Sequence, residues 1–166
     1  INDDTLQPGA MVPNHEHKNY DILGYIVEGE LEHNDSEGNT IRARPNQVQH
    51  MWCGESIWHT EKCMSNTPAR YLQIWITPQK NINTKPYYEI IDRNSDYSRL
   101  NVILNNNIEI NSGNLKGKHT LETKGLSYMY IVSGNVNEFQ EGDGLELDPG
   151  SFTADFDAHI ILFNNC

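Results

Sequence analysis

Hydrophobic and polar residues alternate with a period of two along much of the chain. In the segment 71–77, Leu72, Ile74 and Ile76 alternate with residues of other character. Because successive side chains of a strand point to opposite faces, this pattern predicts a strand. Further segments rich in β-branched, aromatic and aliphatic residues also predict strands: 25–27, 99–104, 126–132 and 159–163.

Turn sequences separate these segments, and we find no segment with a helical period. The turn signals are the stretches DSEGN, SGN, EGDG and DPGS. Many short strands joined by such turns predict an all-β barrel or sandwich. The longest irregular stretch, residues 78–98, is interpreted as a linker with a short helical turn near residues 88–91.

An internal repeat divides the chain into two similar halves. The heptapeptide YIVEGEL at 25–31 matches YIVSGNV at 130–136, an offset of 105 residues. The segment RPNQV at 44–48 aligns with DPGSF at 148–152, an offset of 104 residues. A strand, a glycine turn, a strand and a proline turn therefore occur twice in the same order. We expect two β modules, residues 1–80 and 99–166, joined by a linker at 81–98.

The amino-acid composition limits which binding partners and which cellular compartment we expect. The 166 residues include 12 Lys and Arg against 23 Asp and Glu, a net charge of −11, and the basic residues are scattered. Without a basic patch, direct nucleic-acid binding is disfavoured. No apolar run is long enough to cross a bilayer, so no membrane association is expected. The three cysteines lack disulfide-like spacing, which favours a reducing cytoplasm with Cys53 and Cys63 inert in the core.

Two pairs of potential metal ligands occur in the first module. His15 and His17 are two residues apart, and so are His59 and Glu61. In extended segments each pair points to one face, so two neighbouring strands could surround one ion. Three imidazoles and a carboxylate suit divalent iron, manganese, nickel, copper or zinc, and leave two positions of an octahedral ion open. The alternative is that the His-x-His pair is an accident of the surface and the site is empty.

The second module keeps little of this ligand pattern. With the offset of 104, His15 corresponds to His119, but His17 corresponds to Leu121. The remaining histidines are weighed individually. We expect His33 to face the interior and bind a backbone group, His50 to be solvated, His119 to be a relic and His159 to lie at a strand edge. The three tryptophans could line a flat pocket, although aromatic residues in strands are more often core.

Residues 1–80 resemble the pirin family of the cupin superfamily. The resemblance is carried by INDD at 1–4, HEHKNYDILGYIVEGELEHNDSEGN at 15–39, HTE at 59–61 and YLQIWITP at 71–78. It implies two tandem jelly-roll-type cupin barrels, the second degenerate. It also implies His15, His17, His59 and Glu61 as ligands of a divalent metal, with Fe(II) expected first. The family normally has about forty residues before INDD, so the start of this chain is expected to be truncated.

The same resemblance implies a function and an alternative to it. Bacterial pirins resemble quercetin 2,3-dioxygenases, which implies a metal-dependent dioxygenase with a flavonol-like substrate and Glu61 as the catalytic proton acceptor. The alternative is a non-catalytic, metal-binding regulatory module that binds a protein partner. A purely structural double barrel with an empty site is the third reading.

Overall fold

The computed structural model describes residues 1–79, 84–102, 104 and 106–165. Every regular element in this part of the chain is a β-strand, which confirms the predicted all-β class. None of the described residues forms a helix that could cross a membrane. The strands are β1 (Asn2–Leu6), β2 (Met11–His17), β3 (Asp21–Glu28), β4 (Leu31–Asp35), β5 (Thr40–Ala43), β6 (Gln47–Trp52), β7 (Ile57–Cys63), β8 (Ala69–Ile76), β9 (Tyr87–Asp92), β10 (Ser98–Arg99), β11 (Ile108–Thr123), β12 (Ser127–Val136), β13 (Phe139–Gln140), β14 (Gly144–Leu147) and β15 (Gly150–Asn165).

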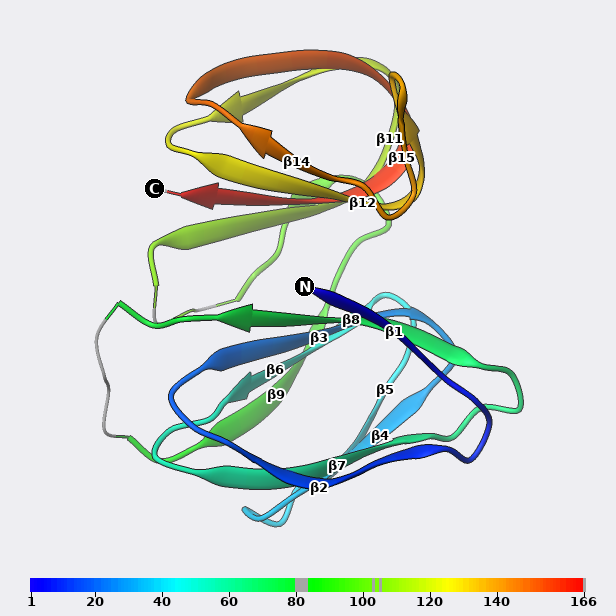
Figure 1. The fold of residues 1–166 in the computed structure, drawn as a ribbon, viewed down its shortest axis with the longest axis vertical. Helices are drawn as coiled ribbons and strands as arrows, with labels where there is room; N and C mark the ends of the chain where they lie inside the picture. Colours follow the sequence, from blue (N-terminus) through cyan, green and yellow to red (C-terminus); the bar gives the residue numbers. More distant parts are fainter. Residues whose placement is uncertain (80–83, 103, 105, 166) are drawn as a thin grey trace. The chain divides into compact units, whose positions relative to one another are not determined.

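The chain folds into two compact units. The first comprises Ile1–Arg93 with Ile103–Asn106, and the second comprises Asn94–Val102 with Asn107–Cys166. The first unit contains two antiparallel sheets, with strand orders β1-β8-β3-β6-β9 and β2-β7-β4-β5 (Figure 1). Apolar side chains from both sheets form a buried cluster between them: Ile26, Leu31, Ala43, Cys63, Ala69 and Tyr71. This packing of two sheets creates the interior in which the candidate ligands lie.

The segment predicted as a linker contributes strands to both units. Residues 87–92 form β9, which pairs with β6, so the helical turn predicted near residues 88–91 is wrong. Pairing explains the difference, because Ile91 lies opposite Val48 and both side chains are buried. Short β10 belongs to the second unit and pairs with β11. Tertiary pairing of this kind is not visible in a short segment with mixed propensities.

The strand predicted at residues 99–104 is largely wrong. Only residue 99 of this segment lies in a strand, residues 100–102 and 104 lie in none, and residue 103 is outside the described residues. The backbone N–H of Val102 donates to the carbonyl of Leu100 over 2.9 Å, which closes a tight turn. A turn at this point ends the ladder that the hydrophobic composition suggested.

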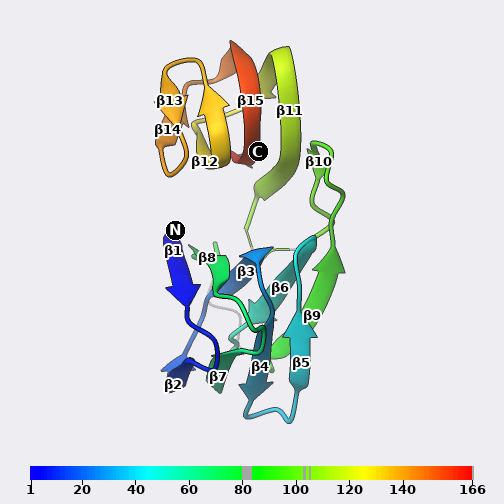
Figure 2. The ribbon, with the colours of Figure 1, turned by 90° about the vertical axis from the view of Figure 1, so that its right-hand side faces the viewer.

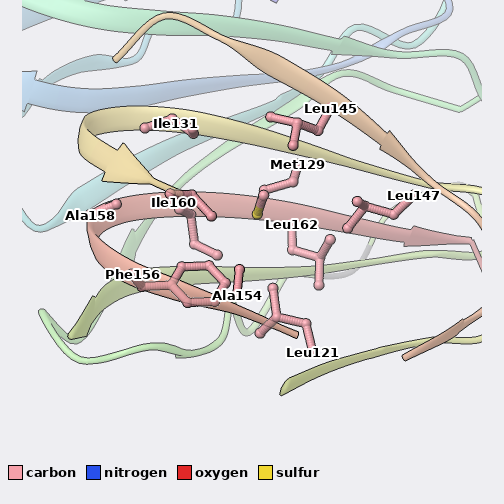
Figure 3. Packing of buried hydrophobic residues seen from close by; sticks show 11 residues of the cluster. Leu121, Met129, Ile131, Leu145, Leu147, Ala154, Phe156, Ala158, Ile160 and Leu162 are labelled. Atoms are coloured by element: carbon pink, nitrogen blue, oxygen red, sulfur yellow. The ribbon is translucent and has the colours of Figure 1, made fainter. Parts of the chain in front are cut away.

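The second unit is a single six-stranded sheet with the order β10-β11-β15-β12-β13, in which β14 also pairs with β12 (Figure 2). Strands β11 and β15 pair along all sixteen residues of each, from Ile108 opposite Asn165 to Thr123 opposite Gly150. Side chains of β11, β12, β14 and β15 converge on one apolar cluster (Figure 3). The cluster comprises Leu121, Met129, Ile131, Val136, Leu145, Leu147, Ala154, Phe156, Ala158, Ile160 and Leu162.

The internal repeat appears in the structure as a repeated strand irregularity. In the first unit, the pairing of β3 with β8 shifts register between Ile26 and Glu28. In the second unit, the pairing of β12 with β15 shifts between Ile131 and Ser133. The two shifts lie 105 residues apart in the sequence, since 131 − 26 and 133 − 28 both equal 105. This is the offset of the matching heptapeptides. The sequence match therefore reflects the same β-bulge in two similar modules.

A glycine follows each bulge because no other residue fits. Gly29 has φ 75° and Gly134 has φ 81°, both in the left-handed region. A Cβ at Gly29 would lie 2.6 Å from the Cα of Ala69, and one at Gly134 would lie 2.0 Å from the carbonyl oxygen of Asp157. Both glycines thus satisfy a backbone conformation and a close approach to a neighbouring strand.

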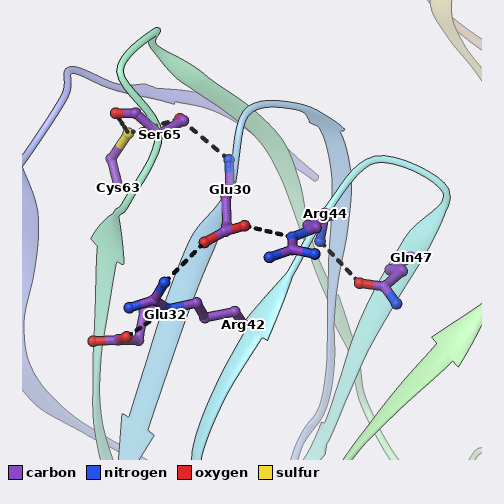
Figure 4. Close-up of polar contacts among 7 residues, drawn as sticks. All are labelled: Glu30, Glu32, Arg42, Arg44, Gln47, Cys63 and Ser65. Carbon is purple, nitrogen blue, oxygen red and sulfur yellow. Dashed lines mark hydrogen bonds and ion pairs between the residues drawn. The ribbon is translucent and has the colours of Figure 1, made fainter.

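The turn at Gly29 leads into a hairpin, β4–β5, that is held by polar contacts (Figure 4). The carboxylate of Glu30 accepts hydrogen bonds from Arg42 and Arg44, and its backbone N–H donates to the Oγ of Ser65 over 3.2 Å. The Sγ of Cys63 lies 3.4 Å from the same Oγ. Since both arginines are exposed, these ion pairs stabilise the fold only weakly. They nevertheless position β4, the strand that approaches the candidate site.

Candidate metal centre

Strand β7 lies between β2 and β4 and directs alternate residues into the interior of the first unit. Ile57, His59, Glu61 and Cys63 are buried, whereas Trp58 between them is exposed. The register places His15 of β2 directly opposite His59. Directly opposite residues of an antiparallel pair point to the same face, which explains how sequence-distant histidines meet.

Three of the predicted ligands come together, and the fourth lies in an overlapping group. One ligand atom from each of His15, His17 and His59 lies within 4.8 Å of the others. A second group with the same limit contains His33, His59 and Glu61. Glu61 therefore shares His59 with the histidine triad but is not in one group with His15 and His17.

The carboxylate of Glu61 is held on the side of the opposite sheet. Its Oε2 accepts hydrogen bonds from the Oη of Tyr71 over 3.2 Å and from the Nε2 of Gln73 over 2.8 Å. Burial raises the pKa of Glu61, and these two hydrogen bonds oppose the effect. Both donors come from β8, so the two sheets jointly determine the orientation of this carboxylate.

The triad has the properties of a coordination site. The Nε2 atoms of His17 and His59 are buried and have no hydrogen-bond partner among the described residues. Such orphaned atoms are uncommon and need an explanation. The Nδ1 of His15 donates to the carbonyl of Pro13 over 2.8 Å, which leaves its Nε2 as the atom with the lone pair. Metal-binding histidines typically use one ring nitrogen in this way and coordinate through the other.

The triad is also electrically suited to a cation. Burial lowers the pKa of His17 to about 4 and that of His59 to about 3, with smaller contributions from neighbouring histidines. Both imidazoles are therefore neutral at pH 7, and a neutral imidazole is the form that binds a metal. The donor set of the chain thus fits a divalent ion of borderline character.

Behind His59 lies a second polar network. The Nδ1 of His59 lies 3.3 Å from the Nδ1 of His33, and the Nε2 of His33 lies 3.0 Å from the Oδ2 of Asp35. His33 was predicted to face the interior and bind a backbone group; it does face the interior, but its partners are side chains. Burial lowers the pKa of His33, which keeps it neutral. Burial also raises the pKa of Asp35, but hydrogen bonds from Asn39 and His33 outweigh this and hold the pKa below its ordinary value.

Aromatic rings pack against His17 of the triad and against His33. The ring of Trp75 packs edge-on against His17 with centroids 4.7 Å apart, and Tyr20 lies 5.4 Å from Trp75. The ring of Tyr88 stacks on His33 at 4.0 Å. The tryptophans do not share one role, because Trp52 is buried whereas Trp58 and Trp75 are each 46% exposed. Trp75 contacts a candidate ligand, His17.

Two other histidine predictions are wrong. His50 was expected to be solvated, but it is fully buried between Asp21 and Glu89, at 2.9 Å and 3.0 Å from their carboxylates. His159 was expected at a strand edge, but β15 is central, and His159 lies between Asn114 of β11 and Ser133 of β12. His119 contacts the carbonyl of Lys116 and belongs to no ligand group among the described residues.

Comparison with known proteins identifies the family. The pirin family model matches residues 1–76. A quercetin 2,3-dioxygenase of Escherichia coli K12 is 30% identical over an alignment of 189 residues, which covers 99% of this chain and 80% of the relative. This chain belongs to the pirin family. A quercetin 2,3-dioxygenase of Escherichia coli O157:H7 is 42% identical over 54% of this chain, and the match covers 38% of that relative.

Solved structures of bacterial pirins have the same double-cupin architecture. YhhW from Escherichia coli superposes with a TM-score of 0.88 at 27% identity, covering 99% of this chain and 79% of YhhW. A second YhhW structure, a complex with nickel(II), has the same TM-score at 26% identity, covering 97% of this chain and 79% of YhhW. The predicted tandem cupin fold is thereby confirmed. The chain is a pirin-like protein related to quercetin 2,3-dioxygenases, and its histidine and glutamate cluster could bind a divalent metal.

Several residues of the candidate site escaped sequence reasoning. Tyr71 and Gln73, which hold Glu61, were assigned only to a strand, and Asp35 was assigned only to a turn. The signal that could have found them is strand register, because Asp35 pairs with His59 and His33 pairs with Glu61. Register across β4 and β7 cannot be read from either segment alone, since it depends on the turns that join them.

Proposed function

We propose that this pirin is a metal-dependent oxygenase of the quercetin 2,3-dioxygenase type. The observation that carries the proposal is the pair of buried Nε2 atoms of His17 and His59, which have no hydrogen-bond partner within the described part of the chain and lie in one triad with His15. The names of the bacterial relatives give the reaction class. Among divalent ions, Fe(II) is the first candidate. When bound, the ion would supply Lewis acidity toward an aromatic hydroxyl group and leave coordination positions open beside the protein ligands.

In this proposal the ligands are His15, His17, His59 and Glu61. The three imidazoles would hold the ion from β2 and β7, and the lowered pKa values of His17 and His59 keep these two rings neutral at pH 7. Glu61 is the fourth ligand, which requires one oxygen of its carboxylate to turn toward the triad. Its Oε2 keeps the hydrogen bonds from Tyr71 and Gln73, so Oε1 is the oxygen that turns toward the triad.

Glu61 is also proposed as the proton acceptor. A carboxyl group whose pKa is raised by burial accepts a proton more readily near neutral pH than an exposed one. The proton would come from the hydroxyl group of a flavonol-like substrate. Trp75 presents an exposed aromatic ring next to His17, on which a planar substrate could stack.

Oxygen uptake tests the proposal. Iron-loaded protein should consume dioxygen and release carbon monoxide when quercetin is added. The His17→Ala variant should lose this activity, whereas His119→Ala, a histidine change in the second unit, should retain it. Absence of uptake with iron, manganese, nickel, copper and zinc would refute the oxygenase proposal. Metal binding without uptake would favour the alternative, a non-catalytic metal-binding module for a protein partner.

A further inference from the structure

His33 and Asp35 form a buried hydrogen-bond network with His59 that the proposed chemistry does not use. The antiparallel pairing of β4 with β7 places Asp35 opposite His59 and His33 opposite Glu61. The side chains of His33 and Asp35 are 1% and 0% exposed. Burying a carboxylate and an imidazole together is costly unless their hydrogen bonds are satisfied, so the pattern of those hydrogen bonds is informative.

Both carboxylate oxygens of Asp35 accept hydrogen bonds. Its Oδ1 accepts from the backbone N–H groups of Glu37 and Asn39, each over 3.0 Å. Its Oδ2 accepts from the Nδ2 of Asn39 over 2.8 Å and from the Nε2 of His33 over 3.0 Å. A carboxylate with four donors around it cannot donate in return. The proton between Asp35 and His33 therefore belongs to the Nε2 of His33.

This assignment propagates along the network. A neutral histidine with its proton on Nε2 has its lone pair on Nδ1. The Nδ1 of His33 lies 3.3 Å from the Nδ1 of His59, so His59 must donate from that atom. The lone pair of His59 is then on Nε2, the buried atom that has no partner among the described residues. Each step follows from the number of protons that the preceding group can supply.

We propose that His33 and Asp35 are positioning residues that hold His59 in the tautomer and rotamer that present its Nε2 to His15 and His17. The inference rests on the proposed metal site and is independent of the oxygenase reaction. Mutating a residue that hydrogen-bonds to a metal ligand in this way typically lowers the metal affinity by about 10- to 100-fold. The turn that holds Asp35, through the backbone of Glu37 and Asn39, is therefore part of the site.

The rival reading makes His33 a direct ligand, because it is in one group with His59 and Glu61. Two observations oppose it. Both ring nitrogens of His33 are engaged, Nε2 with Asp35 and Nδ1 with His59. Its ring is also stacked on Tyr88 with an interplanar angle of 19°, which restrains rotation. A ligand would need one of these nitrogens to be free.

The variant Asp35→Asn reverses the polarity of the network. The two backbone N–H groups on Oδ1 require an oxygen at that position, so the amide nitrogen takes the place of Oδ2. It then donates to the Nε2 of His33 and to the side-chain amide of Asn39, which must turn over to present its oxygen in place of its nitrogen. The donation to His33 moves the proton of His33 to Nδ1 and that of His59 to Nε2. We expect the affinity for nickel(II), measured by calorimetric titration, to fall about 10- to 100-fold. Tyr88→Phe is the matched control, because it keeps the stacked ring and removes only a hydroxyl group that is buried without a partner in the described part of the chain.

The variant His33→Gln distinguishes positioning from ligation. Its amide nitrogen can donate to Asp35 while its amide oxygen accepts from His59, so the original polarity is kept. A positioning role predicts that His33→Gln binds nickel(II) more tightly than Asp35→Asn. A ligand role predicts the opposite order, because Asp35→Asn retains the imidazole and His33→Gln removes it. That opposite order, or affinities of both variants within about threefold of the unaltered protein, would overturn the proposal.

The tautomer of His59 in the metal-free, unaltered protein is an independent test that does not depend on a variant folding. Nitrogen-15 correlation spectra of the imidazole rings should show the proton of His59 on Nδ1. A proton on Nε2 would overturn the proposal. If the unaltered protein binds no nickel(II), the proposed metal site fails, while the tautomer measurement still decides whether His33 and Asp35 orient His59.

Discussion

Replacing Gly29 by alanine tests the claim that the bulge and turn before β4 require glycine. An L-residue in the left-handed region costs about 1–2 kcal/mol. The new Cβ would also lie 2.6 Å from the Cα and 2.8 Å from the Cβ of Ala69, contacts with backbone and a methyl group that cannot rotate away. Overpacking of this kind adds about 1–3 kcal/mol. We therefore expect Gly29→Ala to lower the free energy of unfolding by about 2–5 kcal/mol.

The matched control is Gly9→Ala. Gly9 has nearly the same φ, 76°, but a Cβ there would meet nothing within 4 Å. Gly9→Ala should therefore carry only the conformational cost, and the difference between the two variants isolates the contact with Ala69. All three tryptophans, at 52, 58 and 75, belong to the first unit, so tryptophan fluorescence during urea unfolding reports this unit.

At a urea dependence of about 2 kcal/mol per molar, Gly29→Ala should lower the unfolding midpoint by about 1 M or more. A Gly29→Ala midpoint equal to that of Gly9→Ala would refute the steric argument. Equal slopes in the two variants are needed for this comparison, since a changed slope indicates a changed unfolded or folded state.

Two further predictions concern titration and reactivity. Burial raises the pKa of the Cys53 thiol to about 12, so iodoacetamide at pH 8 should label Cys53 by mass spectrometry only after unfolding; labelling of the folded protein at the unfolded rate would contradict its burial. In the metal-free protein, burial lowers the pKa of His17 to about 4 and that of His59 to about 3, from the ordinary 6.5. Between about pH 6.5 and 4, the unfolded chain therefore binds protons at these histidines that the folded chain does not bind. The free energy of unfolding should therefore fall from pH 7 to pH 4.5, and less steeply in His17→Phe; equal slopes in the two proteins would count against the lowered pKa of His17.

The fold could be predicted from the sequence where local pattern and tertiary pairing agree. Period-two alternation located β8, and the repeated heptapeptide located the equivalent strand and glycine turn in both units. Prediction failed at residues 87–92 and 99–104, where tertiary contacts decide the structure of short segments. Strand β9 forms because it pairs with β6, and the segment after β10 closes a tight turn between Leu100 and Val102. No local pattern carries that information.

The candidate site could be predicted in part for the same reason. The spacing of His15 with His17 and of His59 with Glu61 identified residues that share a face, and the structure brings the three histidines together. Their supporting residues depend on register between strands that are separated in sequence. His33 was therefore expected only to bind a backbone group and Asp35 only to lie in a turn, although the pairing of β4 with β7 places them opposite the candidate ligands Glu61 and His59.

The coordination shell of bound nickel(II) is the measurement that tests the central claim most directly. X-ray absorption spectroscopy of protein loaded with one equivalent of nickel(II) should show three imidazoles and one carboxylate around the ion. The His17→Ala variant should show one imidazole fewer at the same metal content. An unchanged imidazole count in that variant, or a shell of water alone in the unaltered protein, would contradict a metal centre built from His15, His17, His59 and Glu61.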